Sequence, residues 1–443
     1  MTSIASDTPC VLIIAPHGSY RTFDFIQAAE KLGVTTLIAS EGKHSIISAY
    51  AQGIHLDFTA DSETIFQQLK LAIATSNITA VIATDDYTTE LAARIAKDLD
   101  LPHNDPTSVK LTQRKDLARD RLAQHHISKP DHFRLDLEKN IQSQIEKLDY
   151  PVVVKPVGLS ASRGVIRTNN QVELLDAVAR IQNLLNSMND LDVDIKRYLL
   201  VEEFIPGMEV AVEAMLTDGY LRILTIFDKP DPLEGPFFEE TYYITPTSLD
   251  NQVQEQVRKV LEAACQAYGL SEGPIHAECR LNQRGVFVIE IAARTIGGLC
   301  GRLLSFGTGR QLEELVLLQA MRRPLELQQH ELAAGVLMIP IPKAGVLKRV
   351  EGLLEAQRVP YVDEINIQIR EGHELIPLPE GASYLGFIFA HAPTTQEAEL
   401  ALREAHAKLK FVIAPIWKLE AGETGLPGTS SNNHQPQPIH QVN

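Results

Sequence analysis

The sequence predicts a multidomain protein of mixed α/β and α+β class, on three observations. The chain has 443 residues, which is too long for one ordinary hydrophobic core. Up to about residue 110, short apolar runs alternate with helical patterns across short connections, as in a parallel α/β sheet. From about residue 331, short strand patterns and one helix replace them, which is typical of a small, mostly antiparallel α+β domain.

Composition and charge narrow the class of protein. Hydrophobic residues make up 44% of the chain and charged residues 22%, as in ordinary globular proteins. The formal net charge of -16 argues against a nucleic-acid partner, because affinity for a phosphate backbone comes from Lys and Arg. A few basic side chains gathered in one cleft can still bind a small anion.

The cysteine pattern and the hydropathy bear on the compartment. The four cysteines form no CxxC pair, so neither a disulfide framework nor a zinc ribbon is indicated. No apolar run approaches the roughly 20 residues of a membrane helix, and the N-terminus lacks a basic region before an apolar stretch. We therefore expect a cytoplasmic protein without a membrane partner.

The first unit spans about residues 1–110. Its strand patterns include "VLIIAPHG" at 11–18 and "AVIATDD" at 80–86, with "FDFIQAAEKLG" as a helix between strands. The first loop, "APHGSYR", has one glycine and no GxGxxG pattern, so a dinucleotide fingerprint is absent.

A helix is predicted next, from about Pro106, with Asp105 as its N-cap. Lys115 and Arg119 lie four residues apart and would share one face of this helix. By themselves they indicate only a solvated basic face.

The stretch "YPVVVKPVGLSASRGVIRT" places Lys155 inside a β-branched run. The loop 158–164 that follows consists mainly of small residues, which let backbone N–H groups approach phosphates closely. It lacks the GK[ST] ending of a P-loop, so the lysine would come from the preceding strand. A plain hairpin turn is the alternative, although seven residues is long for one.

A polar helix at 171–189 leads to "YLLVEEFIPGMEVAVEAML". This pattern predicts a strand ending in two acids, a turn and a new strand, which suits a hinge between two lobes. Residues 228–247 then combine four prolines with several acids, a composition that we expect neither in a helix nor in a central strand. An ordered loop of that length is usually functional.

The stretch "HAECRLNQRGVFVIEIAARTIGG" predicts two antiparallel strands joined by a turn near residue 284. Such pairing would place Glu278 opposite Glu290, with Arg294 and a glycine pair following. Mg²⁺ prefers one or two carboxylates together with phosphate oxygens and water. The polar face of an ordinary hairpin remains the alternative.

The order of these motifs resembles that of the ATP-grasp superfamily, over about residues 8–420. The resemblance implies an ATP-grasp fold with an N-terminal parallel α/β domain, two ATP-binding lobes and a small C-terminal α+β domain. The corresponding boundaries are 1–110, 111–205 for the small lobe, 206–330 for the large lobe and 331–420. Residues 421–443 are polar and rich in Gly, Pro and Ser, and are expected to be a disordered tail.

The resemblance implies that ATP lies between the two lobes. Two lysines would contact the phosphates under a loop of small residues, two acids would receive the adenine amino group and the ribose hydroxyls, and the hinge backbone and an aromatic wall would surround the base. The residues concerned are Lys115, Lys155, Ser160, Ser162, Gly164, Glu202, Glu203, Phe204, Ile205 and Glu209.

The resemblance also assigns the metal site and the reacting centre. Glu278 and Glu290 would hold Mg²⁺ or Mn²⁺, although Ala292 stands where many members have an Asn ligand. Arg294 in "EIAAR" resembles the L-amino acid ligases, where it would stabilise developing negative charge together with a backbone N–H of Gly297 or Gly298.

The activity implied is an ATP-dependent carboxylate–amine ligase that forms an amide or peptide bond through an acyl phosphate. Its substrates would be a small-molecule carboxylate and an amine, most simply amino acids, and a homodimer is compatible with the resemblance. Glu240 and Tyr243 would recognise an amino group, with a structural acid and a core-edge tyrosine as the alternative. Other ATP-grasp ligases of the carboxylase or purine-biosynthesis type, and a non-catalytic ATP-binding protein, also stay open.

Overall fold

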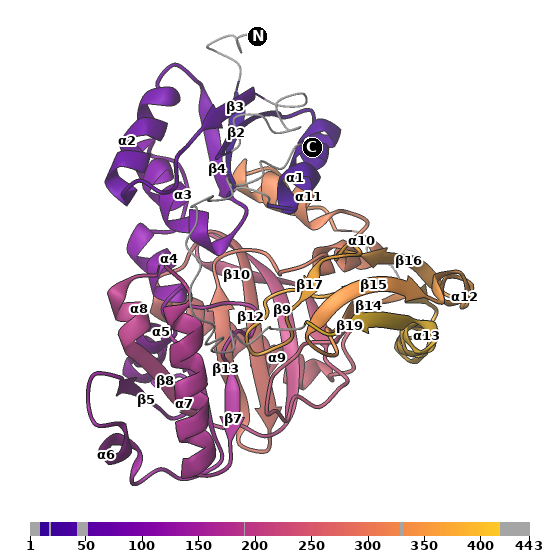
Figure 1. Cartoon of the computed structure of the whole chain (residues 1–443). Coiled ribbons are helices and arrows are strands. Elements are labelled where there is room, and N and C mark those ends of the chain that lie inside the picture. The colour runs from indigo at the N-terminus through magenta and orange to yellow at the C-terminus, as the bar shows by residue number, and fades with distance from the viewer. Residues whose placement is uncertain (1–8, 17–18, 42–51, 190, 328–331, 417–443) are drawn as a thin grey trace, which may run out of the picture.

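A computed structural model of the chain describes residues 9–16, 19–41, 52–189, 191–327 and 332–416. An N-terminal unit lies at one end of the molecule, a small sheet and a large sheet lie beneath it, and the C-terminal part lies to one side (Figure 1). The predicted tail at 421–443 lies outside the described residues.

The N-terminal unit is a four-stranded parallel sheet, which confirms the predicted parallel α/β class. The strand order is β3-β2-β1-β4. All five residues of β1 are buried, as expected for a strand covered by helices on both faces. The strands are β1 (Cys10–Ile14), β2 (Thr35–Ser40), β3 (Gln52–His55) and β4 (Ile78–Ala83). The helices are α1 (Arg21–Leu32), α2 (Ser62–Ala72) and α3 (Asp86–Asp98).

A second four-stranded sheet, of order β5-β8-β6-β7, is antiparallel throughout. One hydrophobic cluster of buried residues joins it to α7, which covers the sheet. Its strands are β5 (His132–Asp136), β6 (Val152–Pro156), β7 (Ile166–Thr168) and β8 (Tyr198–Glu203). The accompanying helices are α6 (Ile141–Ile145), α7 (Gln171–Asn186) and α8 (Val193–Arg197).

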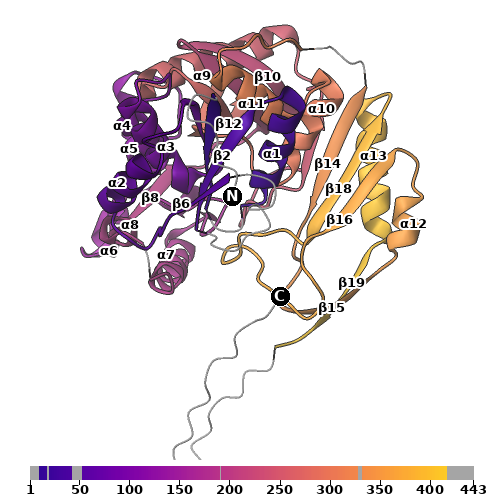
Figure 2. The ribbon, with the colours of Figure 1, turned by 90° about the horizontal axis from the view of Figure 1, so that it is seen from above.

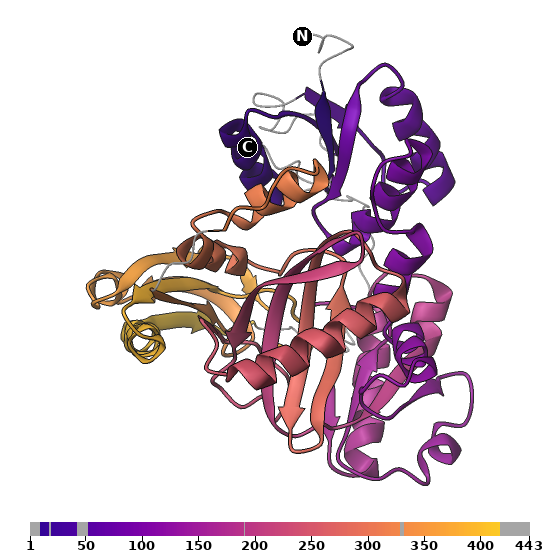
Figure 3. The same ribbon diagram turned by 180° about the vertical axis from the view of Figure 1, so that it is seen from behind.

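The largest sheet has eight antiparallel strands in the order β13-β12-β9-β10-β11-β14-β18-β16. Helix α9 (Asn251–Tyr268) runs across its outer face and buries Val257, Leu261 and Cys265 against it (Figure 3). The strands are β9 (Met208–Thr217), β10 (Tyr220–Asp228), β11 (Tyr242–Thr245), β12 (Gly273–Asn282), β13 (Gly285–Ala292), β14 (Ala333–Ile339), β16 (Val362–Ile367) and β18 (Gly386–Ala392).

Strands from both sides of residue 330 share this sheet, because β11 pairs with β14. Helix α13 (Thr395–Lys408) covers β14 and β18 in the C-terminal part (Figure 2). A separate three-stranded sheet of order β17-β15-β19 lies beside them. The remaining elements are η2 (Cys300–Arg302), α10 (Leu303–Thr308), α11 (Leu312–Ala320), β15 (Gly345–Glu351), α12 (Leu353–Gln357), β17 (Glu374–Leu375) and β19 (Lys410–Ala414).

Two predictions of secondary structure were wrong. The helix expected from Pro106 is two helices, α4 (Pro106–Thr112) and α5 (Lys115–Gln124), because the Lys115 N–H donates to the Val157 carbonyl at 2.9 Å. The segment 228–247 is not entirely loop, because its residues 242–245 form β11 in the middle of the large sheet. Its prolines all lie outside this strand, whose four residues are aromatic or β-branched.

Among the described residues, none of the helices combines the length and the apolar character that crossing a membrane requires.

Candidate active site

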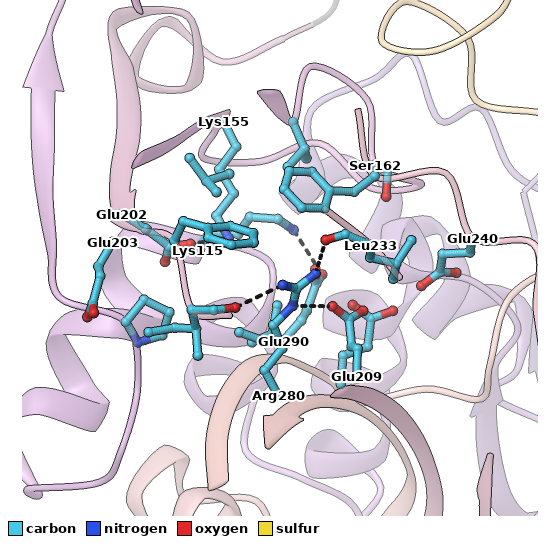
Figure 4. Close-up of a pocket in the computed structure, with 18 of the residues that line it drawn as sticks. Lys115, Lys155, Ser162, Glu202, Glu203, Glu209, Leu233, Glu240, Arg280 and Glu290 are labelled. Carbon is cyan, nitrogen blue, oxygen red and sulfur yellow. Dashed lines mark hydrogen bonds and ion pairs between the residues drawn. The ribbon is translucent and has the colours of Figure 1, made fainter. Parts of the chain in front are cut away.

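A pocket lies between the small sheet β5-β8-β6-β7 and the β9, β12 and β13 end of the large sheet. We call it the interlobe pocket. It holds about 710 Å³ of space, open mouth included, and is lined by residues from both sheets. Glu202 and Glu203 lie at one end of it, and Glu209 and Glu240 at the other (Figure 4). Of the ten residues predicted to bind a nucleotide, only Gly164 does not line it.

Lys155 and Glu202 form a buried ion pair in this pocket. The adjacent strands β6 and β8 carry them, and a second cation, Arg119 of α5, donates from Nε to Glu202 Oε1 at 2.5 Å. Although burial opposes ionisation, the charges of Arg119 and Lys155 lower the pKa of Glu202 to about 2. Burial, only partly offset by Glu202, lowers the pKa of Lys155. Both Glu202 oxygens therefore already have cationic partners.

The hinge residues Glu203, Phe204 and Ile205 follow directly after Glu202. Phe204 is buried, and the guanidinium groups of Arg167 and Arg280 lie 4.1 and 5.1 Å from the centre of its ring. The Glu203 N–H donates to the Asp131 carbonyl, and the Ile205 carbonyl accepts from Arg280. Of the backbone groups of Glu203 and Ile205, the Glu203 carbonyl and the Ile205 N–H therefore remain to form hydrogen bonds with the edge of a base.

Glu209 stands on β9 directly opposite Arg280 of β12. Arg280 Nε donates to Glu209 Oε2 at 2.7 Å, and its other nitrogens reach the carbonyls of Ile205 and Leu233 (Figure 4). The remaining Glu209 oxygen, Oε1, lies 2.8 Å from Lys229 Nζ. Arg280 therefore ties the hinge, the 228–247 segment and the large sheet together at the floor of the pocket.

Glu278 and Glu290 are paired residues on β12 and β13, as the hairpin pattern predicts. Glu290 Oε1 accepts from Lys115 Nζ at 2.8 Å, so the first residue of α5 reaches across the pocket. Glu278 lies opposite Ala211 of β9 on its other side. Its Oε1 is 3.3 Å from Lys229 Nζ and 3.9 Å from His276 Nε2.

The chemistry of this carboxylate pair fits a hard divalent cation. Burial disfavours the charge on Glu278, yet Lys229 and His276 hold its pKa well below the usual range, so an anionic ligand is available. Ala292, at the position of a common third ligand, is buried opposite His276. Although burial opposes ionisation, hydrogen bonds to Glu213 and Glu278 raise the pKa of His276 to about 9, so at neutral pH the ring is a cation and not a free ligand. The protein would thus supply two carboxylates, Glu278 and Glu290, to the coordination shell of the ion.

A second cavity adjoins the first and shares Ser160, Ser162, Glu240, Glu278 and Glu290 with it. We call it the Arg294 pocket. Residues from the N-terminal unit, the large sheet and the C-terminal part line it, among them Arg294 itself.

Arg294 is oriented by the N-terminal unit. Its Nε donates to Asp86 Oδ2 at 2.8 Å, and Asp86 is the first residue of α3. Burial opposes ionisation of this aspartate, but the neighbouring Arg294 lowers its pKa. The guanidinium is therefore a fixed positive charge in the pocket that also contains Glu278 and Glu290, the two carboxylates suited to a metal ion, which we call the metal-type carboxylates.

Gly297 and Gly298 both line the Arg294 pocket, but they differ in how well their backbone conformation and surroundings would accept a side chain. Gly298 has φ +61°, and a Cβ there would lie 3.1 Å from the Phe387 ring, whereas a Cβ on Gly297 would meet no atom within 4 Å. Gly298 is thus the residue on which the shape of this turn depends.

Tyr243 and Glu240 also meet in the Arg294 pocket. The Tyr243 hydroxyl donates to Glu240 Oε2 at 2.6 Å, and Lys229 Nζ lies 2.5 Å from Glu240 Oε1. Burial and the nearby Glu278 raise the pKa of Glu240 to about 7 despite Lys229. The two residues predicted to contact substrate are therefore one hydrogen-bonded unit.

The loop of small residues, 158–164, stands over both pockets. Ala161 and Ser162 both have φ near +55°, an uncommon conformation for residues other than glycine. The Gly164 N–H donates to the Pro379 carbonyl at 2.8 Å, and Arg163 Nε donates to the Glu380 carbonyl at 3.1 Å. The C-terminal part thus helps to hold the loop.

Comparisons with known proteins agree with this architecture. The family model for the ATP-grasp domain matches residues 148–302, which include Lys155, both metal-type carboxylates and Arg294. This part of the chain is an ATP-grasp domain. The model for the L-amino acid ligase C-terminal domain 2 matches residues 337–414.

Individual similar proteins are distant from this chain in sequence. The crystal structure of L-amino acid ligase from Bacillus licheniformis superposes with a TM-score of 0.80 and 26% identity, covering 91% of this chain and 98% of that one. Dapdiamide A synthase of Enterobacter agglomerans is 25% identical over 86% of this chain and 94% of its own length. Alanine–anticapsin ligase of Bacillus subtilis is 23% identical over 55% of this chain and 54% of its own.

Three buried cations of this ATP-grasp site were missed or undervalued from sequence. From sequence alone Arg119 indicates only a basic face, and no pattern singles out Arg280 or Lys229. Arg280 could have been found, because strand alternation places it on the same face as Glu278. Lys229 follows the end of β10, where no periodicity indicates its direction.

Proposed function

We propose that this chain is an ADP-forming carboxylate–amine ligase that joins small molecules, most simply two amino acids. One observation carries the proposal: the interlobe pocket and the Arg294 pocket share Glu278 and Glu290. A nucleotide in the first pocket would present its terminal phosphate at these carboxylates. A carboxylate substrate in the second would meet that phosphate beside Arg294.

The protein's own side chains have separate tasks in this proposal. Lys155 and Lys115 would leave their carboxylate partners to bind phosphate oxygens, under the backbone and hydroxyls of Ser160, Ser162 and the loop ending at Gly164. Glu209 would face the ribose and Glu202 the adenine end, with the Glu203 carbonyl and the Ile205 N–H reading the base against Phe204.

Glu278 and Glu290 would hold Mg²⁺, or Mn²⁺, and a bound ion would neutralise charge on the phosphates. The substrate carboxylate attacks the γ-phosphorus, which forms an acyl phosphate and releases ADP. The amine then attacks the acyl carbon and phosphate leaves, so that an amide forms. Arg294 and an N–H at Gly297 or Gly298 would stabilise the oxyanion of that step.

Several further assignments belong to the proposal. The proposed domains are 1–110, 111–205, 206–330 and 331–420, with β11 and β14 pairing across the last boundary. The protein acts in the cytoplasm on a small carboxylate and a small amine. We propose no nucleic-acid or membrane partner, and a homodimer is compatible with the fold.

The proposal is tested by incubating the protein with MgATP and pairs of amino acids while ADP is measured and products are identified by mass. We expect at least one pair to raise ADP release and to give the mass of the dipeptide. If ATP binds but no carboxylate and amine pair raises ADP release above background, the ligase proposal is wrong.

A further inference from the structure

A turn in the C-terminal part contacts both the small-residue loop and the Arg294 pocket. It comprises residues 377–384, between β17 and β18, and we call it the C-terminal turn. Its Pro379 carbonyl accepts from the Gly164 N–H at 2.8 Å. Its Glu380 carbonyl accepts from Arg163 Nε at 3.1 Å. The last residues of the turn line the Arg294 pocket, namely Ala382, Ser383 and Tyr384. One short segment therefore joins the loop that stands over both pockets to the wall of the Arg294 pocket.

The C-terminal turn is compact, so its two ends are closely connected. The Gly381 N–H donates to the Pro377 carbonyl at 2.9 Å. A Cβ on Gly381 would lie 1.9 Å from the Ile376 carbonyl oxygen, so this close approach of the backbone requires glycine. A shift at one end of such a turn therefore displaces the other end.

The side chain of Glu380 anchors the C-terminal turn to the small lobe. Arg180 of α7 donates from Nε to Glu380 Oε1 at 2.5 Å and from Nη2 to Oε2 at 2.9 Å. This two-point contact fixes the relative orientation of the two planar groups. The side chains of Arg180 and Glu380 are 46% and 38% exposed, so the pair adds little to the stability of the fold. Its main effect is therefore to fix the position of Glu380, whose carbonyl meets Arg163.

The small-residue loop depends on such support from outside. Ala161 and Ser162 both have φ near +55°, and such a conformation persists where the surroundings hold it. Within the loop, the Arg163 N–H donates to the Ser160 carbonyl over a long 3.3 Å. The bonds from Gly164 and Arg163 to the C-terminal turn are shorter. These bonds therefore stabilise the closed position of the loop.

We propose that Glu380 is a positioning residue that keeps the small-residue loop closed over both pockets until the amine has reacted with the acyl phosphate. When the loop opens early, water attacks the acyl phosphate in place of the amine. The free carboxylate and phosphate then leave, and one ATP has been consumed without an amide. This inference rests on the proposed ligase function and adds to it a residue that couples ATP use to amide formation.

The first test measures uncoupled ADP, which is ADP released without dipeptide, as a fraction of all ADP formed from MgATP and one amino-acid pair. In Glu380→Gln this fraction should rise about two- to fivefold, the usual effect of an exposed ion pair on an equilibrium. A variant that merely contained less folded enzyme would lose ADP and dipeptide equally, which leaves the fraction unchanged. An unchanged fraction in Glu380→Gln would overturn the inference.

Glu351→Gln is the matched control for this test. It breaks a comparably exposed ion pair of the C-terminal part, in which Glu351 and Arg349 are 37% and 58% exposed. The uncoupled fraction should stay at the wild-type value in this variant. An equal rise in Glu351→Gln and Glu380→Gln would overturn the inference, because any weakening of the C-terminal part would then be sufficient.

A double variant tests whether Arg180 and Glu380 act as one pair. Arg180→Met alone should raise the uncoupled fraction as much as Glu380→Gln alone. Arg180→Met combined with Glu380→Gln should raise it no further, because both changes break the same contact. Increases that multiply in the double variant would show that the two residues act separately and would contradict the anchoring role of Arg180.

A third test needs no turnover and is therefore independent of the ligase proposal. Trypsin cuts the Arg163–Gly164 bond only while the loop is open, and its rate follows the open population when opening is fast. Without nucleotide, Glu380→Gln and Arg180→Met should be cut at this bond about two- to fivefold faster than wild type and Glu351→Gln, with fragments identified by mass. Equal rates would overturn the role of Glu380, whatever the enzyme makes. Faster cutting in a protein that releases no ADP with any pair would support that role and contradict the ligase proposal alone.

Discussion

Lys115 Nζ lies 2.8 Å from Glu290 Oε1, although 175 positions separate the two residues. This contact joins the start of α5 to the C-terminal end of β13, and both residues line the interlobe pocket. It also gives Glu290 two tasks, since the same carboxylate is a proposed metal ligand. In the ATP-bound protein we expect Lys115 to exchange Glu290 for phosphate oxygens.

Glu290→Ala should lower kcat for ADP formation by about a thousandfold or more, because it removes one of the two metal-type carboxylates. The fold should persist, since Glu290 is only half-buried at the pocket edge. ADP formation and circular dichroism measure the two effects. Glu355→Ala, on the exposed face of α12, is the control. Normal ADP formation by Glu290→Ala would exclude the metal assignment.

Arg294→Met should lower kcat by about a hundredfold to a thousandfold, as expected for loss of a charge that stabilises an oxyanion. The Kd for ATP should stay the same, because Arg294 lines only the adjoining pocket. Asp86→Asn keeps the arginine but loosens its orientation, so a smaller loss of about tenfold in kcat is expected. A large change in ATP affinity would place Arg294 at the nucleotide instead.

Glu202→Gln should destabilise the fold at pH 7 by about 3 kcal/mol, because Lys155 and Arg119 lose their shared anion. The pKa of Glu202 is about 2 in the folded chain against an ordinary 4.5, so its contribution is complete above pH 4.5. That contribution is lost as the pH falls from 4.5 towards 2. Urea unfolding followed by circular dichroism should therefore show the gap between wild type and variant closing over this range. A gap that widens on acidification would contradict the ion-pair assignment.

Gly298→Ala and Gly297→Ala form a matched pair within one turn. Gly298→Ala should cost about 1–3 kcal/mol of unfolding free energy, because its φ of +61° strains an L-residue and its Cβ would press on the Phe387 ring. Gly297→Ala, with open space around its Cβ, should change stability by less than about 1 kcal/mol. Thermal unfolding of both variants measures the difference. Equal losses would mean that the turn has another conformation.

Local sequence patterns were sufficient to predict the positions of those site residues that lie within one hairpin or one loop. Glu278 and Glu290 face each other because a short turn sets the register of two neighbouring strands. Lys155 and the small-residue loop were equally local. The order of these motifs along the chain resembles that of one superfamily, and this resemblance predicts the fold.

Contacts between distant segments could not be predicted in this way. The Lys155–Glu202–Arg119 cluster needs three elements of the small lobe to meet, and only packing shows that Glu202 is engaged by two cations. Lys229 Nζ lies 5.3 Å from the centre of the Tyr243 ring, and Tyr243 belongs to β11. The sequence does not predict this strand, because prolines surround Tyr242–Thr245. Ala292 was recognised as a departure, but its burial opposite His276 required the strand register.

The most direct test of the ligase proposal is the stoichiometry of products from one amino-acid pair with MgATP. ADP, phosphate and dipeptide should be measured together by coupled assay and mass spectrometry. We expect equal amounts of all three, because each amide bond consumes one acyl phosphate. ADP and phosphate released without dipeptide, or ATP bound without any ADP release over the whole panel of pairs, would contradict it.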